Sequence, residues 1–308
     1  MTESKVLVLD GAAGSYLEAM NVPLHPKLWS SGALMNKEGQ MAIRDLHRAY
    51  LDAGADVITS VTYQASVAGF QEAGLSEKDS YNLIKLGISL AQEEAKLYGP
   101  DKLVAAGFGP YGAYLCEGQE YTGDYKAIHK STLRDFWLPR INAALEKRPD
   151  YILFETIPNL DELEVIVNDL TPLCKAQGIP VWVSLSIKIE EGDVKLADGT
   201  DLHELTDMVD RISLIGANCF DAHRINLILG KFQQLKMPLI FYPNHGEVYD
   251  GITKTWTRSD TVECFNSDMI RNMIECGTLV IGGCCNTTPD TIRIINKAVQ
   301  EQKEKNVK

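Results

Sequence analysis

Short apolar runs recur along the chain and alternate with amphipathic stretches, in which apolar residues return every three or four positions. The runs are rich in β-branched residues and are apolar almost throughout, as strands of a parallel sheet buried on both faces are. Their alternation with helical patterns is typical of repeated βα units. The pattern predicts eight strands, at residues 6–10, 56–60, 103–107, 151–155, 181–187, 212–219, 239–242 and 279–283.

Eight helices are predicted between and after these strands, at residues 38–53, 77–98, 125–147, 160–176, 201–210, 223–235, 261–276 and 290–302. Asn159 with Glu162, and Asp260 with Glu263, each pair a capping residue with an acid three positions later. Thr288-Pro289 places proline at a first helical position. Eight βα units predict an α/β fold, a single (β/α)8 barrel domain with a parallel sheet that spans residues 1–308.

Composition narrows the classes of partner. The chain has 308 residues, 45% hydrophobic and 23% charged, with a net charge of −12. This acidic balance, without a basic stripe, disfavours nucleic acid and anionic membranes as partners. We see no signal-peptide pattern and no apolar run near the roughly 20 residues that span a bilayer, so we expect a cytoplasmic protein. Seven cysteines in such a protein favour metal or catalytic thiols over a disulfide framework.

Three of the cysteines stand at strand ends. Cys219 ends the strand predicted at 212–219, and the adjacent Cys284 and Cys285 follow the strand at 279–283. The carboxyl ends of barrel strands meet at one rim, so we expect the three side chains to face the same site. Three thiolates suit tetrahedral Zn²⁺ and would leave its fourth position open for a substrate, as in catalytic zinc sites.

Acidic residues fall at the same predicted rim. Asp10-Gly11 ends the first strand and Glu155 ends the fourth, and carboxylates at buried strand ends cost free energy unless they bind a partner. Two longer polar loops, at 23–37 and 110–124, also follow strand ends, where barrel enzymes build active sites. Simpler roles stay open, since Asp10 could cap a turn and Glu155 could pair with a buried cation.

The cysteines have simpler interpretations too, because free cysteine is among the most buried residue types. We assign core packing to the other four: Cys116, Cys174, Cys264 and Cys276. The alternative for the three at strand ends is a closed structural zinc site, with His223 or His245 as fourth ligand. Residues 107–112 match the dinucleotide pattern G-x-G-x-x-G, but no clear helix follows, so we interpret them as a substrate loop.

An open zinc site with three thiolates favours a particular chemistry. Three thiolates leave the ion with a net negative charge, which weakens it as a Lewis acid and disfavours the activation of water. A thiol substrate fits better, because a free thiol has a pKa near ~8.5 whereas a zinc-bound thiol is deprotonated outright. The natural reaction is attack by that sulfur on an activated alkyl group.

An ordered series of motifs resembles the zinc-dependent homocysteine S-methyltransferase family over nearly the whole chain. The motifs are Asp10-Gly11, Ala53-Gly54-Ala55-Asp56, Thr62-Tyr63-Gln64-Ala65-Ser66, Gly109-Pro110-Tyr111-Gly112-Ala113, Glu120-Tyr121-Thr122-Gly123-Asp124-Tyr125, Phe154-Glu155-Thr156-Ile157-Pro158-Asn159, Asp198-Gly199-Thr200, Asn218-Cys219, Tyr242-Pro243-Asn244, Lys254-Thr255-Trp256 and Gly282-Gly283-Cys284-Cys285. Family members are single barrels, in agreement with the eight predicted βα units.

The resemblance implies roles for individual residues. It implies that Cys219, Cys284 and Cys285 bind zinc and that the homocysteine sulfur takes the open position. It also implies that the amino-acid end of homocysteine is held by Asp10, Gly11, Glu155 and Asn218. Carboxylates suit an α-ammonium group, and backbone N–H groups suit a carboxylate. We assign catalytic roles to the three cysteines together with Asp10 and Glu155.

Within the family, the segments around Tyr63, Tyr111 and Tyr121 resemble the branch that uses S-methylmethionine, often with S-adenosylmethionine as a second donor. Both donors are sulfonium cations, which favour acidic and aromatic surroundings. The candidates for the wall of the donor site are Tyr63, Tyr111, Tyr114 and Trp256. Two departures bear on donor preference: His245 stands where relatives commonly have serine, and Asn286 replaces the arginine or glycine often found after the cysteine pair.

We therefore predict a homocysteine S-methyltransferase of the EC 2.1.1 class, with Zn²⁺ as cofactor and homocysteine and a sulfonium donor as substrates. The thiolate would take the methyl group directly and become methionine, with proximity rather than acid–base work supplying the catalysis. One alternative is the same site with another donor or acceptor, such as betaine or selenocysteine. The other is a non-catalytic zinc- or thiol-binding protein.

Overall fold

Eight parallel strands form the centre of the computed structural model, which describes residues 5–245, 248–250, 255–257 and 265–306. Along the sheet the order is β1-β12-β9-β8-β5-β4-β3-β2. A parallel bridge between Leu9 and Val57 joins the first strand to the last, so the sheet closes. The strands are β1 (Leu7–Val8), β2 (Val57–Thr59), β3 (Leu103–Phe108), β4 (Tyr151–Ile157), β5 (Val181–Leu185), β8 (Leu214–Asp221), β9 (Leu239–Asn244) and β12 (Thr278–Ile281).

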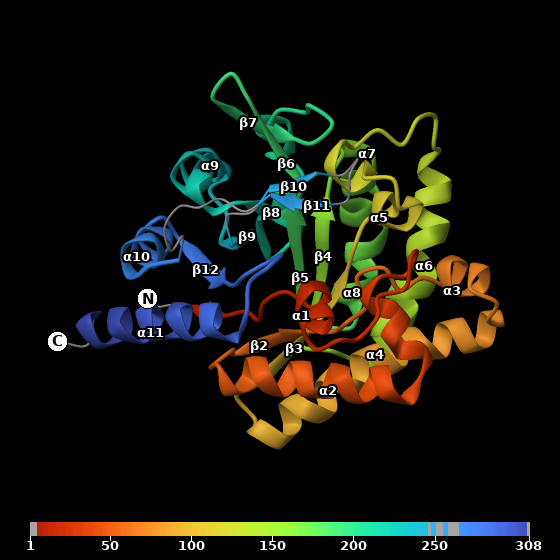
Figure 1. Cartoon of the computed structure of the whole chain (residues 1–308). Helices are drawn as coiled ribbons and strands as arrows, with labels where there is room; N and C mark the ends of the chain where they lie inside the picture. The colour runs from red at the N-terminus through yellow and green to blue at the C-terminus, as the bar shows by residue number, and fades with distance from the viewer. Residues whose placement is uncertain (1–4, 246–247, 251–254, 258–264, 307–308) are drawn as a thin grey trace.

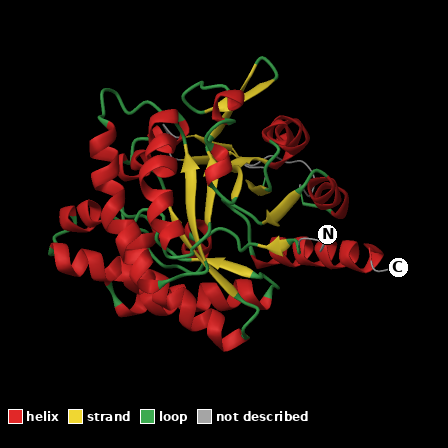
Figure 2. Ribbon diagram, turned by 180° about the vertical axis from the view of Figure 1, so that it is seen from behind, coloured by secondary structure: helices red, strands yellow, loops and turns green. Residues whose placement is uncertain are grey.

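The helices surround this sheet (Figures 1 and 2). They are α1 (Gly14–Ala19), α2 (Lys37–Asp52), α3 (Val67–Glu72), α4 (Glu77–Tyr98), α5 (Tyr111–Leu115), α6 (Lys130–Lys147), α7 (Leu160–Val165), α8 (Thr171–Ala176), α9 (Ile225–Phe232), α10 (Ser267–Glu275) and α11 (Pro289–Asn306). A π-helical turn, Ile166–Leu170, joins α7 to α8 into one helical segment. The predicted α/β fold, a (β/α)8 barrel with a parallel sheet, is confirmed.

Apolar side chains fill the inside of the barrel, as in other proteins of this fold. The inner cluster consists of Leu9, Val57, Ala105, Leu153, Trp182, Leu214, Ile240, Tyr242 and Val280. A larger cluster packs the outer face of the strands against the helices. The barrel is therefore a packed core rather than a channel, and open space for a ligand is left at the rim.

The connection from β5 to β8 differs from the prediction. A hairpin of β6 (Ile187–Glu190) and β7 (Asp193–Leu196) follows β5 and projects at the top of Figure 1. The helix expected at 201–210 is instead two 3₁₀ turns, Leu202–Leu205 and Val209–Arg211. The first and last residues of the Leu202–Leu205 turn are both buried, and a 3₁₀ turn brings residues three apart onto one face.

Two other helices begin later in the chain than predicted. The helix expected at 125–147 begins at Lys130, and the one expected at 261–276 begins at Ser267, where the Asn266 side chain caps it. Asp260, Glu263 and Cys264 lie outside the described residues. The loop at 23–37 contains a 3₁₀ turn, Ser30–Met35, and the loop at 110–124 contains α5 and the 3₁₀ turn Gln119–Tyr121.

A charge cluster around the buried Glu94 joins α2 to α4. The Glu94 carboxylate accepts hydrogen bonds from Arg44 Nη1 at 2.8 Å and from Arg48 Nε at 2.7 Å. His47 lies beside it, fully buried, and neither ring nitrogen has a hydrogen-bond partner among the described residues. Burial lowers the pKa of His47 to about 4, although the negative charge of Glu94 acts in the opposite direction. The imidazole is therefore neutral at physiological pH.

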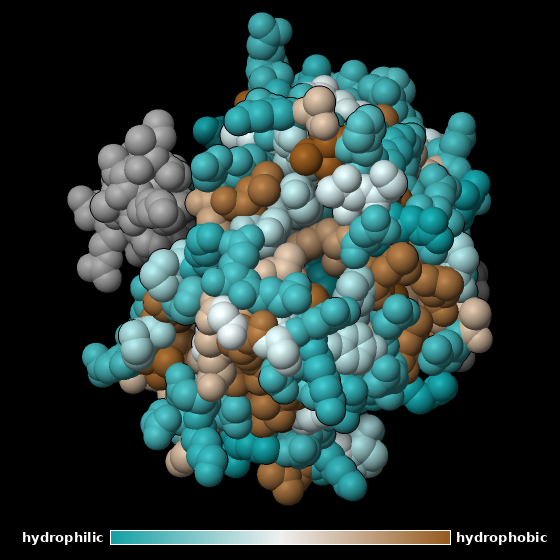
Figure 3. Space-filling view, turned by 90° about the vertical axis from the view of Figure 1, so that its right-hand side faces the viewer, coloured by the Kyte–Doolittle hydropathy of each residue, from teal (hydrophilic) through white to brown (hydrophobic). Residues whose placement is uncertain are grey.

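The face of the molecule in Figure 3 is mostly hydrophilic, with separate small apolar areas. Single exposed apolar side chains are normal on a folded protein. No helix among the described residues is both long and apolar enough to cross a membrane.

Candidate active site

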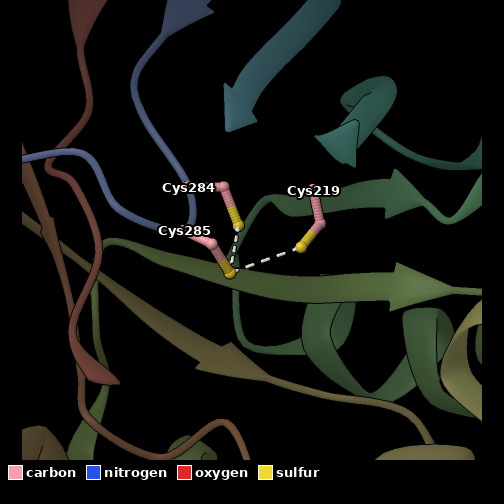
Figure 4. A group of neighbouring side chains, drawn as sticks. All are labelled: Cys219, Cys284 and Cys285. Carbon is pink, nitrogen blue, oxygen red and sulfur yellow. Dashed lines mark hydrogen bonds between the residues drawn. The ribbon is translucent and has the colours of Figure 1, made fainter. Parts of the chain in front are cut away.

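Three thiols converge at the rim of the barrel. Cys219 lies in β8, and Cys284 and Cys285 follow β12 (Figure 4). The Cys285 sulfur is 3.5 Å from that of Cys219 and 4.0 Å from that of Cys284, and all three sulfurs lie within 4.8 Å of one another. Cys219 has a left-handed backbone, with φ of 57°, where the pairing of β8 with β9 shifts register. That irregularity turns its side chain toward the other two.

The backbone around the cysteine pair is fixed by neighbouring segments. The Cys284 N–H donates to the Pro243 carbonyl at 2.8 Å, and the Cys285 N–H donates to the Asn244 side chain at 3.1 Å. The Thr287 hydroxyl donates to the Cys284 carbonyl at 2.6 Å. Gly283 must lack a side chain, because a Cβ there would lie 2.4 Å from the Thr287 hydroxyl. The thiols are thus held in place before any ligand binds.

The sulfur spacing matches a tetrahedral metal site. Zinc–sulfur bonds of ~2.3 Å at tetrahedral angles place sulfurs about 3.8 Å apart, inside the observed range. No fourth histidine, cysteine or carboxylate among the described residues joins the cluster. The ring of His245 stacks on Phe265, with centroids 6.2 Å apart. Hydrogen bonds with Cys284 and Cys285 lower the pKa of the Cys219 thiol well below its ordinary value, which favours a thiolate there.

Two carboxylates lie at the same rim. Asp10 accepts hydrogen bonds from the Thr59 N–H at 2.7 Å and from its hydroxyl at 2.9 Å, while burial raises the pKa of Asp10 to about 7. Glu155 accepts one from the Tyr242 hydroxyl at 3.2 Å. Burial, and next the negative charge of Asp10, raise the pKa of Glu155 to about 8. Two acids that oppose each other's ionisation provide a place for a cation.

Asn218 connects three strands to the thiol cluster. Its side-chain oxygen accepts from the Thr156 N–H at 3.0 Å and from the Ser184 hydroxyl at 2.7 Å. Its side-chain nitrogen donates to the Thr156 hydroxyl at 2.9 Å and to the Cys284 sulfur at 3.8 Å. These contacts use both donors and both acceptor positions of the amide. The Asn218 side chain therefore positions Cys284.

A cavity of about 120 Å³ connects these groups. The sequence-predicted residues that line it are Asp10, Gly11, Tyr63, Glu155, Asn218, Cys219, Cys284 and Cys285. Tyr111 and Tyr114, expected in the donor wall, pack instead against Phe136, with ring centroids 5.1 and 5.5 Å away. The fourth expected aromatic side chain, that of Trp256, lies outside the described part of the structure.

Two further aromatic residues line the cavity, Trp29 and Tyr121, and neither was among the candidates for the donor wall. Trp29 adopts φ of 42° and ψ of −125°, a conformation that a residue with a side chain rarely takes. Backbone hydrogen bonds in both directions with His25 hold it there. Its indole nitrogen would lie 2.8 Å from a Cβ on Gly14, so the ring covers that glycine. The only signal for Trp29 was its position in the loop at 23–37.

Tyr121 is the second of these aromatic residues, and its hydroxyl lies 3.6 Å from the Cys219 sulfur. It belongs to the 3₁₀ turn Gln119–Tyr121, whose middle residue is Glu120. One carboxylate oxygen of Glu120, Oε2, is buried without a hydrogen-bond partner among the described residues. Burial raises the pKa of Glu120 to about 7, and the nearby Cys219 acts in the same direction.

A buried arginine supports the loops that carry Tyr63 and α5. Arg140 of α6 is fully buried and donates to the carbonyls of Gly109 and Tyr63, both at 2.8 Å. Its guanidinium lies 4.4 Å from the ring centroid of Trp137. Glu162, fully buried beside it, accepts from the Tyr111 N–H and from Trp137 Nε1 instead of completing the predicted capping box. The Asn159 side chain still caps α7.

The fold and the site together define a (β/α)8 barrel whose rim carries a three-cysteine cluster of metal-binding geometry. A family model described as homocysteine S-methyltransferase matches residues 7–299. The chain belongs to this family, and the predicted resemblance is confirmed.

Individual relatives agree with this assignment. Homocysteine S-methyltransferase 2 of Zea mays is 38% identical, over 97% of this chain and 91% of that protein. Homocysteine S-methyltransferase of Escherichia coli is 34% identical, over 95% of this chain and 94% of that protein. The crystal structure of the metallated form of the Escherichia coli homocysteine methyltransferase MmuM superposes with a TM-score of 0.81, at 31% identity and 96% coverage of both chains.

Proposed function

We propose that this protein transfers a methyl group from a sulfonium donor, S-methylmethionine or S-adenosylmethionine, to the sulfur of homocysteine, and that Cys219, Cys284 and Cys285 hold a zinc ion for this reaction. The observation that carries the proposal is the convergence of three thiols on a cavity that also contains buried carboxylates. When zinc is bound, it keeps a thiol in its open position deprotonated and therefore nucleophilic.

The acids at the rim suit the amino-acid end of homocysteine. Asp10 and Glu155 face the cavity and oppose each other's ionisation, so an α-ammonium group between them would relieve their repulsion. Residues 11–15 also line the cavity, and backbone N–H groups in such a segment suit a carboxylate. Held at both groups, homocysteine would point its side chain toward the cysteines.

Aromatic side chains suit the donor, because a sulfonium cation is attracted to the face of an aromatic ring. Trp29, Tyr63 and Tyr121 line the cavity next to the thiols. In the transfer, the homocysteine sulfur forms a bond to the methyl carbon while the bond from that carbon to the sulfonium sulfur breaks. The donor leaves as a neutral thioether, and homocysteine becomes methionine. The proton of the homocysteine thiol is released before transfer, so the residues around the sulfur need only align the reactants.

The test is methionine formation by the purified, zinc-loaded protein from homocysteine with S-methylmethionine, S-adenosylmethionine or betaine in turn. The matched control is the same protein after removal of zinc by a chelator, and then after zinc is restored. We expect turnover with the sulfonium donors that is lost on chelation and returns with zinc. Bound zinc without turnover of any donor would contradict the proposal and favour a non-catalytic metal site.

A further inference from the structure

Tyr121 carries a hydroxyl group that its task as an aromatic wall of the donor site does not use. This hydroxyl forms a hydrogen bond with the Cys219 sulfur, at 3.6 Å. Hydrogen bonds to sulfur are longer than those to oxygen, because sulfur is the larger atom. Tyr121 and Cys219 both line the cavity, so the bond lies in the wall of the site and next to the place where the substrates would meet.

The direction of this hydrogen bond follows from the chemistry of its two partners. A cysteine that binds a metal ion does so as a thiolate, which has no proton to donate. A phenol has a pKa near ~10 and keeps its proton at neutral pH. The Tyr121 hydroxyl must therefore donate, and the Cys219 sulfur must accept. Hydrogen bonds to a charged acceptor are about twice as strong as those between neutral groups.

Two neighbouring segments hold Tyr121 in this position. Tyr121 ends the 3₁₀ turn Gln119–Tyr121, which packs so closely on α5 that a Cβ on Gly112 would lie 2.6 Å from the backbone of the turn. Just after the turn, the Gly123 carbonyl accepts a hydrogen bond from the Asn159 side chain at 3.1 Å. The hydroxyl is therefore held beside the sulfur by the fold itself, before any ligand binds.

A second sulfur of the cluster also accepts a hydrogen bond from a side chain. The Asn218 side-chain nitrogen donates to the Cys284 sulfur at 3.8 Å. The two donors reach different sulfurs from different elements, Asn218 from β8 and Tyr121 from the loop after β3. Three thiolates leave a bound zinc ion with a net negative charge, and a homocysteine thiolate would add to it. Donors to the sulfurs therefore matter most when homocysteine is bound.

We infer that Tyr121 is a positioning residue whose hydroxyl donates to the Cys219 thiolate and so stabilises the cluster when the homocysteine thiolate joins it. The inference rests on the proposed function, because it needs a metal ion on the cysteines and a thiolate substrate on that ion. The hydrogen bond draws negative charge away from the Cys219 sulfur, and outer partners of metal ligands tune metal sites in this way. The ring of Tyr121 thus serves the methyl donor, and its hydroxyl serves homocysteine.

The variant Tyr121→Phe separates these two tasks, because it removes the hydroxyl and keeps the ring. The matched control is Tyr125→Phe, which removes a buried hydroxyl from the same loop, one that donates to Glu162 instead of to a sulfur. The wild type and both variants are loaded with Co²⁺, because the thiolate-to-cobalt absorption band reports on the charge of the sulfurs. Homocysteine is then titrated into each protein in the absence of any methyl donor.

For Tyr121→Phe we expect the absorption band at longer wavelength, because a sulfur with more negative charge gives an electron to the metal more easily. The dissociation constant of homocysteine should rise about fivefold, as for the loss of one hydrogen bond. With zinc in place of cobalt, KM for homocysteine should rise by a similar factor, while KM for the sulfonium donor stays within about twofold. Tyr125→Phe should lower the urea midpoint of unfolding but match the wild type in the absorption band and in homocysteine binding.

Three outcomes would overturn the inference. An unchanged band and an unchanged dissociation constant in Tyr121→Phe would show that the hydroxyl does not act on the cluster. Equal changes in Tyr121→Phe and Tyr125→Phe would assign the effect to the stability of the loop, and a rise in the donor KM alone would place the hydroxyl at the donor. A wild-type cobalt protein whose spectrum does not respond to homocysteine would instead contradict the proposed function itself, and the inference with it.

Discussion

Replacing His47 with leucine should remove a loss of stability that the wild type suffers in mild acid. His47 is fully buried between α2 and α4, neither ring nitrogen has a partner among the described residues, and its pKa falls to about 4. In the unfolded chain the pKa of histidine is about 6.5. At pH values between these two pKa values, the unfolded state binds a proton that the native state does not bind, so acid favours unfolding.

The size of the effect follows from the two pKa values. The stabilising contribution of the neutral His47 ring is fully present above pH 6.5 and is lost as the pH falls toward the folded pKa. Integrating from neutral pH to pH 4 gives a loss of about 3 kcal/mol in the free energy of unfolding. Leucine cannot bind the proton and fills a similar volume, so His47→Leu should lack this loss.

The assay is urea unfolding of the metal-free wild type and of His47→Leu at several pH values from 7.5 to 4. The two proteins must be compared as a difference, because Asp10, Glu120 and Glu155 act in the opposite sense. Burial raises the pKa of each of these acids, so their contributions are present at low pH and are lost as the pH rises. These contributions cancel in the difference. The stability of the variant relative to the wild type should rise by about 3 kcal/mol toward pH 4, and parallel curves would refute the reasoning.

Further predictions concern the site itself. Cys285→Ala should lose both bound zinc, measured by metal analysis, and methyl transfer; retention of either would show that the thiol cluster is wrongly assigned. Trp29→Phe should keep the donor KM within about threefold, whereas Trp29→Ala should raise it on the order of tenfold, because only a flat ring attracts the cation. Arg140→Met should lower the free energy of unfolding by about 2–3 kcal/mol, since the carbonyls of Gly109 and Tyr63 lose their donor, and urea unfolding checks this.

The strands could be predicted from the sequence because buried parallel strands are apolar almost throughout. All eight expected runs contain or overlap a barrel strand. The short helices α1, α3 and α5 could not be predicted, since six residues or fewer show no usable periodicity. The hairpin of β6 and β7 could not be predicted for a similar reason: each strand has four residues, and none of those in β6 is buried.

The residues of the candidate site also differ in how far the sequence predicts their positions. Residues at strand ends, such as Cys219 and Glu155, could be placed together because parallel strands bring their carboxyl ends to one rim. Trp29 and Tyr121 come from loops, and their positions depend on contacts with distant segments that no local pattern encodes. Tyr111 does not line the cavity for that reason, because its ring packs on Phe136 and its backbone N–H donates to Glu162.

Asp10 also contributes to the closure of the barrel. The strand β1 has two residues, and one isolated bridge joins its end to β2. The Asp10 side chain crosses this seam to the Thr59 N–H and hydroxyl, so it also ties the first strand to its neighbour. Loss of activity in an Asp10 variant would therefore be ambiguous by itself. Hydrogen exchange of the β1 and β2 amides would distinguish a separation of these two strands from the loss of a contact with the ammonium group.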